Sequence, residues 1–185
     1  MKYKTIKSKA NLYFLSSVIT GHKVIFTNAE VAQIPLNSLN WLRENKYCQL
    51  YAYCLMPNHI HAIVRTEMIE KMVARFHSFT AHEIIKYLKK HDEIDLLEVF
   101  EANAQSKKHD RQYLVWEDSL IRIIETKKVL FDLMEYVHNN PVSKKWRLVK
   151  SRGDYPYSSA CYFDKGIGPI IPVDNFGELV VGLTE

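Results

Sequence analysis

The chain has 185 residues, of which 47% are hydrophobic and 25% are charged, and its net charge is +4. This balance is ordinary for a soluble globular protein, and six glycines and six prolines are too few for a linker-rich or disordered chain. The longest apolar runs are far shorter than the ~20 residues of a membrane helix, so we expect no membrane partner. Cys48, Cys54 and Cys161 lack C-x-x-C spacing, which favours free thiols and a cytoplasmic location.

The first half of the chain reads as a strand, a helix and a hairpin. Residues 11–19 are rich in β-formers, and residues 28–44 have apolar residues at helical spacing after Asn28, a plausible cap, with Pro35 making this helix irregular. Residues 47–55 and 59–66 are two strands joined by the short turn Met-Pro-Asn.

The second half begins with an amphipathic helix over residues 68–91, followed by a charged stretch at 92–110 that we expect to be a short helix or loop. A strand is predicted at 112–116, and a helix from Thr126 that Pro141 ends. Beyond residue 150 the sequence is typical of a loop-rich tail. The order of elements predicts an α+β fold, a ferredoxin-like antiparallel sheet with packed helices.

Two histidines on the second hairpin strand form a candidate metal site. His59 and His61 are two positions apart, so in a strand they project from one face, about 6–7 Å apart along the backbone. Ile60, Ala62 and Val64 point the opposite way. Two imidazoles so placed can converge on one divalent cation, although such pairs also occur on strands by chance.

A hard cation needs at least one oxygen donor besides two imidazoles, and Asn140 is the best candidate. It stands four residues after Tyr136, so both side chains share a face in the last turn of a helix over 126–140. Spacing alone favours a plain helix cap for Asn140. A phenol is a poor nucleophile at neutral pH unless a cation polarises the phosphate that it attacks, and among eleven tyrosines composition cannot select Tyr136.

Basic residues fall into clusters, some with aromatic neighbours, a pattern that suits a phosphate backbone carrying unstacked bases. A solvated surface is the alternative for any one cluster. The candidate DNA-binding residues are Lys86, Lys89, Lys144, Lys145, Arg147, Lys150 and Arg152.

Two segments resemble the signatures of the single-tyrosine HUH transposases. CLMPNHIHAIV at 54–64 is similar to the histidine, hydrophobic, histidine strand, and MEYVHNNPVSKKWRLV at 134–149 with DYPYSSA at 154–160 is similar to the tyrosine-helix signature. Asparagine-proline after that helix points to the REP-associated tyrosine transposases rather than to insertion-sequence enzymes, which usually have glutamine in place of Asn140. One departure is Lys145-Trp146-Arg147, where relatives have a small Ala-Gly-like pair.

The resemblance implies a ferredoxin-like HUH domain over residues 1–160, a C-terminal tail of uncertain role at 161–185, and a Mg²⁺ or Mn²⁺ ion. It implies that His59, His61 and Asn140 are ligands and that Tyr136 attacks single-stranded or hairpin DNA, leaving a 5′-phosphotyrosine link and a free 3′-OH. The 3′-OH can later attack this link, so strands are rejoined without an external energy source. The protein would act as a monomer or homodimer.

Two other functions remain open from the sequence. A regulator on the same fold would bind DNA without cleaving it. A zinc hydrolase or structural zinc protein would use His59, His61 and Cys54, with Cys54 beyond the hairpin turn.

Overall fold

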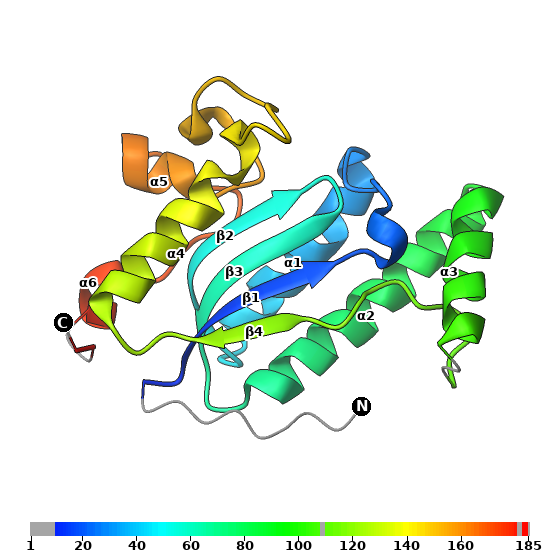
Figure 1. Cartoon of the computed structure of the whole chain (residues 1–185), viewed down its shortest axis with the longest axis horizontal. Helices are drawn as coiled ribbons and strands as arrows, with labels where there is room; N and C mark the ends of the chain where they lie inside the picture. Colours follow the sequence, from blue (N-terminus) through cyan, green and yellow to red (C-terminus); the bar gives the residue numbers. More distant parts are fainter. Residues whose placement is uncertain (1–9, 108–109, 181–182, 185) are drawn as a thin grey trace.

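The computed structural model describes residues 10–107, 110–180 and 183–184. Its elements follow one another in the order strand, helix, hairpin, helices, strand and helix, with short helices at the end (Figure 1). They are β1 (Leu12–Val18), η1 (Thr20–His22), α1 (Ala29–Glu44), β2 (Gln49–Met56), β3 (His59–Arg65), α2 (Ile69–Lys90), α3 (Ile94–Ser106), β4 (Leu120–Ile123), α4 (Lys127–Asn139), η2 (Asn140–Val142), η3 (Arg152–Asp154), α5 (Ala160–Lys165) and α6 (Phe176–Val180).

The four strands form one sheet in the order β2-β3-β1-β4, with every pair antiparallel. β3 lies inside the sheet, and His61 is paired with Ser16 of β1 on one side and with Cys54 of β2 on the other. This arrangement confirms the predicted α+β class and its antiparallel sheet.

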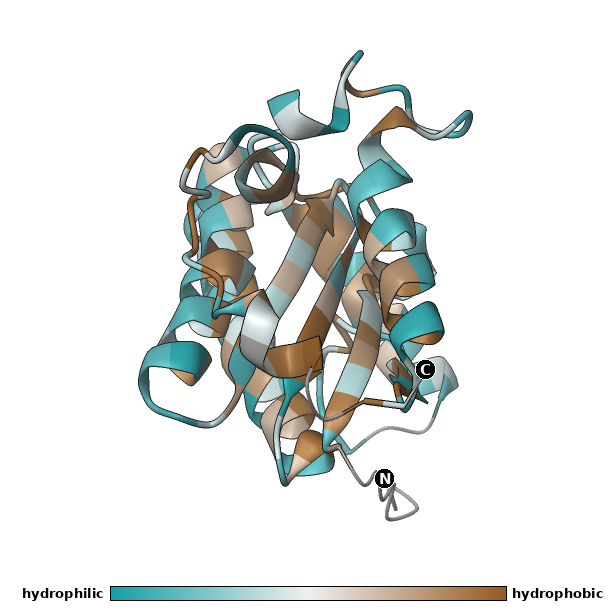
Figure 2. Ribbon diagram, turned by 90° about the vertical axis from the view of Figure 1, so that its left-hand side faces the viewer, coloured by the Kyte–Doolittle hydropathy of each residue, from teal (hydrophilic) through white to brown (hydrophobic). Residues whose placement is uncertain are grey.

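Helices cover both faces of the sheet, because successive side chains of each strand point to opposite sides. Tyr13, Leu15 and Ala62 belong to the core shared with α1 and α2, whereas Phe14 and Ile63 belong to a second core beneath α4. Figure 2 shows hydrophobic residues along the strands and the inner sides of the helices, with hydrophilic residues outside. The sheet is therefore buried on both faces where helices cover it.

Capping residues set the helix starts that the sequence predicted. The Asn28 side chain accepts hydrogen bonds from the backbone N–H groups of Glu30 and Val31. The Thr126 hydroxyl accepts one from the N–H of Val129. Pro35 is buried inside α1, which continues to Glu44.

The strand predicted at 112–116 is wrong in position. Within that segment only Trp116 makes a β-bridge, to Ile19, and the ladder with β1 forms later, at Leu120–Ile123. Val115 and Trp116 are buried and made the segment look like a strand, but they fill the α2 side of the core. The charged stretch at 92–110 contains α3, which packs against α2.

The chain after residue 154 returns to the edge strand β2. Leu55 donates its backbone N–H to the carbonyl of Tyr157, and Ser159 donates its N–H to the carbonyl of Tyr53. Farther on, the Asp174 carboxylate binds Arg43 and the N–H of Leu50. Residues beyond 160 thus include packed structure, while the division of the chain at residue 160 stays a prediction.

No helix in the described part of the chain combines the length and the apolar character needed to cross a membrane.

Candidate functional site

His59 and His61 project together from β3 toward the α4 side of the sheet, as the alternation of side chains predicts. Their ring centroids are 4.6 Å apart. Ile60, between them, lies in the core on the opposite face. The strand therefore presents two imidazoles side by side beneath α4.

His61 is buried, with 3% of its surface exposed, and neither ring nitrogen has a hydrogen-bond partner within the described residues. Its ring stacks on Phe14 at 5.4 Å between centroids. Burial, and then the neighbouring His59, lowers the pKa of His61 to about 3, so the imidazole is neutral at physiological pH. A buried polar group without a partner is costly, and here it offers a lone pair to a ligand.

His59 is oriented by the residue before it. Its Nδ1 lies 2.7 Å from Oδ1 of Asn58, whose Nδ2 donates to the carbonyl of His22 at 3.0 Å. Because an amide oxygen only accepts, Nδ1 carries the proton and Nε2 keeps its lone pair. Burial lowers the pKa of His59 to about 4, and an interaction with the Asn140 side chain partly offsets this.

The sequence pattern predicts only a turn position for Asn58. The signal that could have identified it is an amide directly before a ligand-type histidine, at the end of a hairpin turn.

Helix α4 and the η2 turn that follows it bring Tyr136 and Asn140 over the histidines. Leu130, Leu133 and Val137 face the core, which leaves Tyr136 at the rim with 52% of its surface exposed. The Tyr136 ring lies edge-on to His61 at 5.1 Å. Asn140 is buried at 9% exposure and donates through Nδ2 to the Tyr136 carbonyl. The side chain of Asn140 also interacts with His59, which raises the histidine pKa against the effect of burial, and its amide oxygen is not used in the bond to Tyr136.

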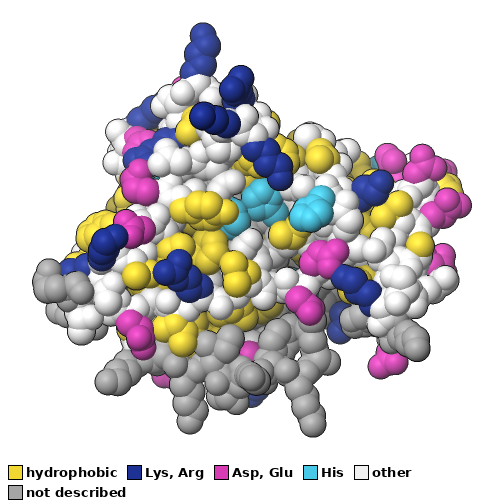
Figure 3. Space-filling view, viewed as in Figure 1, with side chains coloured by type: hydrophobic (Ala, Val, Ile, Leu, Met, Phe, Trp, Pro, Cys, Tyr) yellow, Lys and Arg dark blue, Asp and Glu magenta, His cyan; other side chains and the backbone are white. Residues whose placement is uncertain are grey.

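His59, Tyr136 and Asn140 line one open depression of about 470 Å³, and the buried His61 lies behind His59 rather than in the lining of the depression. Its walls are His59, Asp132, Glu135, Tyr136, Asn139, Asn140, Ser143, Lys145 and Trp146. Figure 3 shows histidine side chains near the middle of this face and Lys and Arg side chains around its upper part. The geometry is that of a neutral donor set at the floor, a phenol at the rim and cations beside it.

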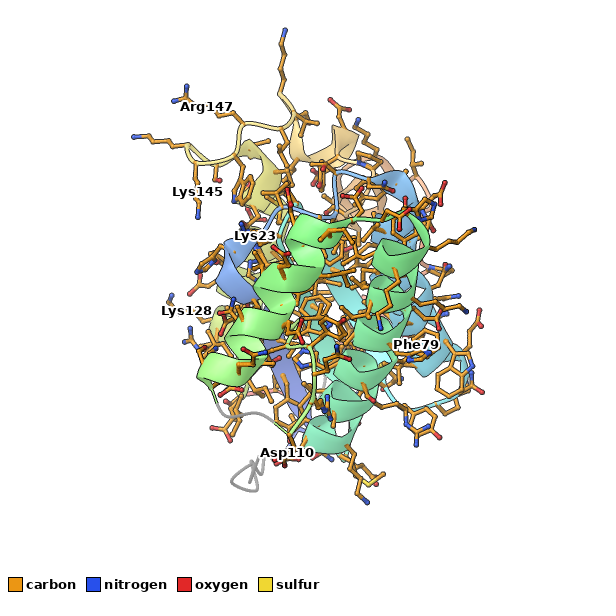
Figure 4. The ribbon with its side chains drawn as sticks, turned by 90° about the vertical axis from the view of Figure 1, so that its right-hand side faces the viewer. Lys23, Phe79, Asp110, Lys128, Lys145 and Arg147 are labelled. Carbon is orange, nitrogen blue, oxygen red and sulfur yellow. The ribbon has the colours of Figure 1, made fainter. Side chains whose placement is uncertain are left out.

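The basic candidates divide between two sides of the molecule. Lys144, Lys145, Arg147 and Lys150 are exposed on the loop after η2. In Figure 4, Lys145 and Arg147 lie on the opposite side of the molecule from Phe79 of α2. Lys86 and Lys89 belong to that α2 layer.

Arg152 differs from the other basic candidates because its guanidinium is already paired. It donates to both carboxylate oxygens of Asp164 at 2.9 Å and to Glu135 at 2.8 Å. These bonds tie α4 to η3 and α5, so this side chain has a structural role.

The site does not support the zinc alternative. Cys54 is paired in register with His61, but its thiol contacts Met56 at 3.6 Å, and burial raises its pKa to about 12. Across the described ranges, no three His, Cys, Asp or Glu residues converge on a metal position. The donor set that does come together is His59, His61 and the Asn140 amide.

No protein-family model and no curated protein matches this sequence. Among solved structures, the chain is similar to a REP-associated tyrosine transposase bound to a REP hairpin, with a TM-score of 0.61 and 14% identity over 95% of this chain and 92% of that one. It is also similar to a presumed transposase from Deinococcus radiodurans, with a TM-score of 0.45 and 15% identity over 75% of this chain and 96% of that one. The first match shows that the chain has the fold of a tyrosine transposase, and so confirms the resemblance found in the sequence at the level of the fold.

Proposed function

We propose that this protein is a transposase that cleaves and rejoins single-stranded DNA at hairpin, REP-like sequences through a covalent link to Tyr136. The single observation that carries the proposal is the Tyr136 ring 5.1 Å from His61, whose two ring nitrogens have no partner within the described residues. A nucleophile thus stands at the rim of a buried donor set. The shared fold with a hairpin-bound tyrosine transposase supports the same function.

The residues present fit a divalent cation, Mg²⁺ or Mn²⁺. His61 offers ring nitrogens without a partner within the described residues, His59 keeps the Nε2 lone pair, and Asn140 keeps its amide oxygen because Nδ2 makes the bond to the Tyr136 carbonyl. The absence of a thiolate distinguishes this set from a structural zinc site, and the amide oxygen is a donor that suits Mg²⁺ or Mn²⁺. When bound, the ion would polarise the scissile phosphate and stabilise its developing negative charge.

The chain's own groups carry the bond changes. The Tyr136 phenol gives up its proton as its oxygen bonds to phosphorus, and the phosphorus–O3′ bond breaks. The electron pair leaves with the 3′ oxygen, which takes a proton and becomes a free 3′-OH. In the reverse step a 3′-OH attacks the phosphotyrosine and Tyr136 regains its proton, so one phosphoester replaces another without external energy.

The loop after η2 provides the cations for the DNA backbone. Lys145 lines the depression, and Lys144, Arg147 and Lys150 are exposed on the same loop, so together they can contact phosphates on either side of the cleaved bond. This activity requires access to chromosomal DNA, and so we place it in the cytoplasm, with the protein acting as a monomer or homodimer.

The test is incubation of the protein with a radiolabelled single strand carrying a hairpin, in Mn²⁺, followed by denaturing electrophoresis. A covalent protein–DNA band is expected with the native protein and none with Tyr136→Phe. Tyr162→Phe is the matched control, because Tyr162 is another half-exposed tyrosine, on α5. An adduct that persists in Tyr136→Phe would show a different nucleophile. Tight binding without any adduct would make the protein a DNA-binding regulator on the same fold.

A further inference from the structure

Trp146 forms one wall of the depression that holds the proposed active site. Its indole centroid lies 5.9 Å from the His59 ring at 42°, and it shares the lining with Tyr136 and Asn140. One part of the side chain packs on the core beneath α4, and the residue as a whole remains partly exposed. An aromatic surface therefore borders the place where the scissile phosphate would lie.

The backbone holds this indole in a fixed place. The N–H groups of Trp146 and Arg147 both donate to the Ser143 carbonyl, and the N–H of Leu148 donates to the carbonyl of Pro141. Arg147 has a φ of 46°, the left-handed region that a non-glycine residue rarely adopts. Such strain persists only where the surrounding structure imposes it. In this chain the strained residue lies in the tight turn that places Trp146 beside α4.

We infer that Trp146 is a stacking platform for the unpaired base next to the scissile phosphate. The inference rests on the proposed function, since it concerns the same DNA strand in the same site. A phosphate held at His59 brings its attached nucleotides to the indole, given the 5.9 Å between the two rings. Single-stranded bases that have lost their stacking neighbours bind aromatic side chains in this way, whatever their sequence.

Lys145 completes the subsite. Its Nζ lies 5.5 Å from the centre of the Trp146 ring, at the outer limit of a cation–π contact, on an exposed loop. Stacking of a base on the indole is the stronger interaction, and the flexible lysine can move to the adjacent phosphate. The pair would thus bind one nucleotide by its base and its phosphate.

The experiment uses the full chain with Tyr136→Phe, so that binding is measured without cleavage. A hairpin oligonucleotide carries 2-aminopurine at one position after another along its single-stranded part. Fluorescence quenching is expected at one or two adjacent positions, lost in Trp146→Ala and largely kept in Trp146→Phe. Trp41→Ala is the matched control, because Trp41 is another accessible tryptophan but lies away from the depression and stacks on Tyr47 between α1 and β2. Thermal melting of each variant establishes that it is folded.

An abasic nucleotide at the quenched position gives a second readout. It should weaken binding about 5- to 150-fold for the protein with Trp146, and produce no further loss in Trp146→Ala. Equal quenching with and without Trp146, or an equal abasic penalty in both proteins, would overturn the inference. Absence of binding to the hairpin strand would overturn it together with the proposed function. Quenching at one position that depends on Trp146, together with no adduct from the protein that keeps Tyr136, would support the stacking site. This combination of results would reject only the covalent chemistry.

Discussion

The rings of Tyr136 and His61 lie edge to face with their centroids 5.1 Å apart, although they come from a helix and a strand distant in sequence. The histidine is buried and the tyrosine is half-exposed. The neutral imidazole of His61 is thus held in apolar surroundings, next to a tyrosine that a DNA strand can reach from solvent.

Replacing His61 by phenylalanine should remove metal binding without loss of stability. The buried imidazole leaves both nitrogens without a partner within the described residues, and such groups cost about 1–3 kcal/mol, a penalty that a phenyl ring stacked on Phe14 avoids. Urea denaturation without metal should give a free energy of unfolding equal to or above that of the native protein. Mn²⁺ should raise the melting temperature of the native protein but not of His61→Phe. An equal rise in both would show that His61 is not a ligand.

Asn58→Ala should weaken metal binding while leaving the ligands in place. The amide of Asn58 orients His59 at Nδ1 and holds the carbonyl of His22. Loss of a group that orients a metal-binding histidine typically costs about 10- to 100-fold in affinity. Titration with Mn²⁺ by calorimetry measures this loss. Asn45→Ala, which removes a bond to the carbonyl of Trp41 at the end of α1, is the control, and a similar loss there would refute a specific role for Asn58.

Lys145→Ala and Arg147→Ala should each reduce the affinity for a short single strand and its dependence on salt. For single strands, each lost phosphate contact lowers the slope of log affinity against log salt by about 0.7. Fluorescence anisotropy from low to high salt measures this slope. Lys46→Ala, at the exposed connection between α1 and β2, should leave it unchanged.

The contribution of Lys89 should depend on DNA length. It lies on α2, away from the loop after η2, with its Nζ 5.0 Å from the Tyr113 ring centre. Lys89→Ala should therefore weaken the binding only of DNA long enough to reach from the loop after η2 to α2 on the other side of the sheet. A loss with the short strand equal to that of Lys145→Ala would contradict the division of the basic residues between two sides.

Ser159→Ala should destabilise the protein by about 1–3 kcal/mol, the cost of leaving buried polar groups without partners. The Ser159 hydroxyl is fully buried, lies 2.9 Å from Nε2 of His138 on α4, and accepts from the backbone N–H of Tyr53 on β2. It therefore links the tyrosine helix to the histidine hairpin. Chemical denaturation measures the loss, with the exposed Ser151→Ala as control. Equal stabilities for the two variants would rule out this link.

Stability should fall on acidification, in part because of His77 on α2. Burial, and then Arg111, lowers its pKa from 6.5 to about 4, so the folded state binds its proton less readily than the unfolded state does. The contribution of His77 to the free energy of unfolding is complete above about pH 6.5 and is lost as the pH falls toward 4. At pH 5 the loss is on the order of 2 kcal/mol. His77→Gln should lose less stability than the native protein between pH 7 and pH 5. The exposed His82→Gln on the same helix should follow the native curve, and a native-like curve for His77→Gln would contradict the assignment.

Much of the fold follows from local patterns in the sequence. Alternation along 59–65 placed His59 and His61 on one face, and caps at Asn28 and Thr126 set where two helices begin. The strand at 112–116 was misplaced, because a short apolar run around Trp116 can fill a core without joining a ladder. Periodicity reports which side of a segment is buried, but it does not report which neighbour buries it.

The sequence by itself determined the chemistry of the donors, namely two strand histidines, a tyrosine and an asparagine four residues apart, and a basic loop. Only the tertiary structure decided that the Tyr136 ring contacts His61, that Asn58 orients His59 and that Trp146 lines the depression. It also placed Lys89 on α2, away from Lys145, and paired Arg152 with Asp164. The physical reason is that the regular backbone of a strand or helix fixes the direction of each side chain locally. Contacts between elements depend on how segments distant in sequence pack against one another.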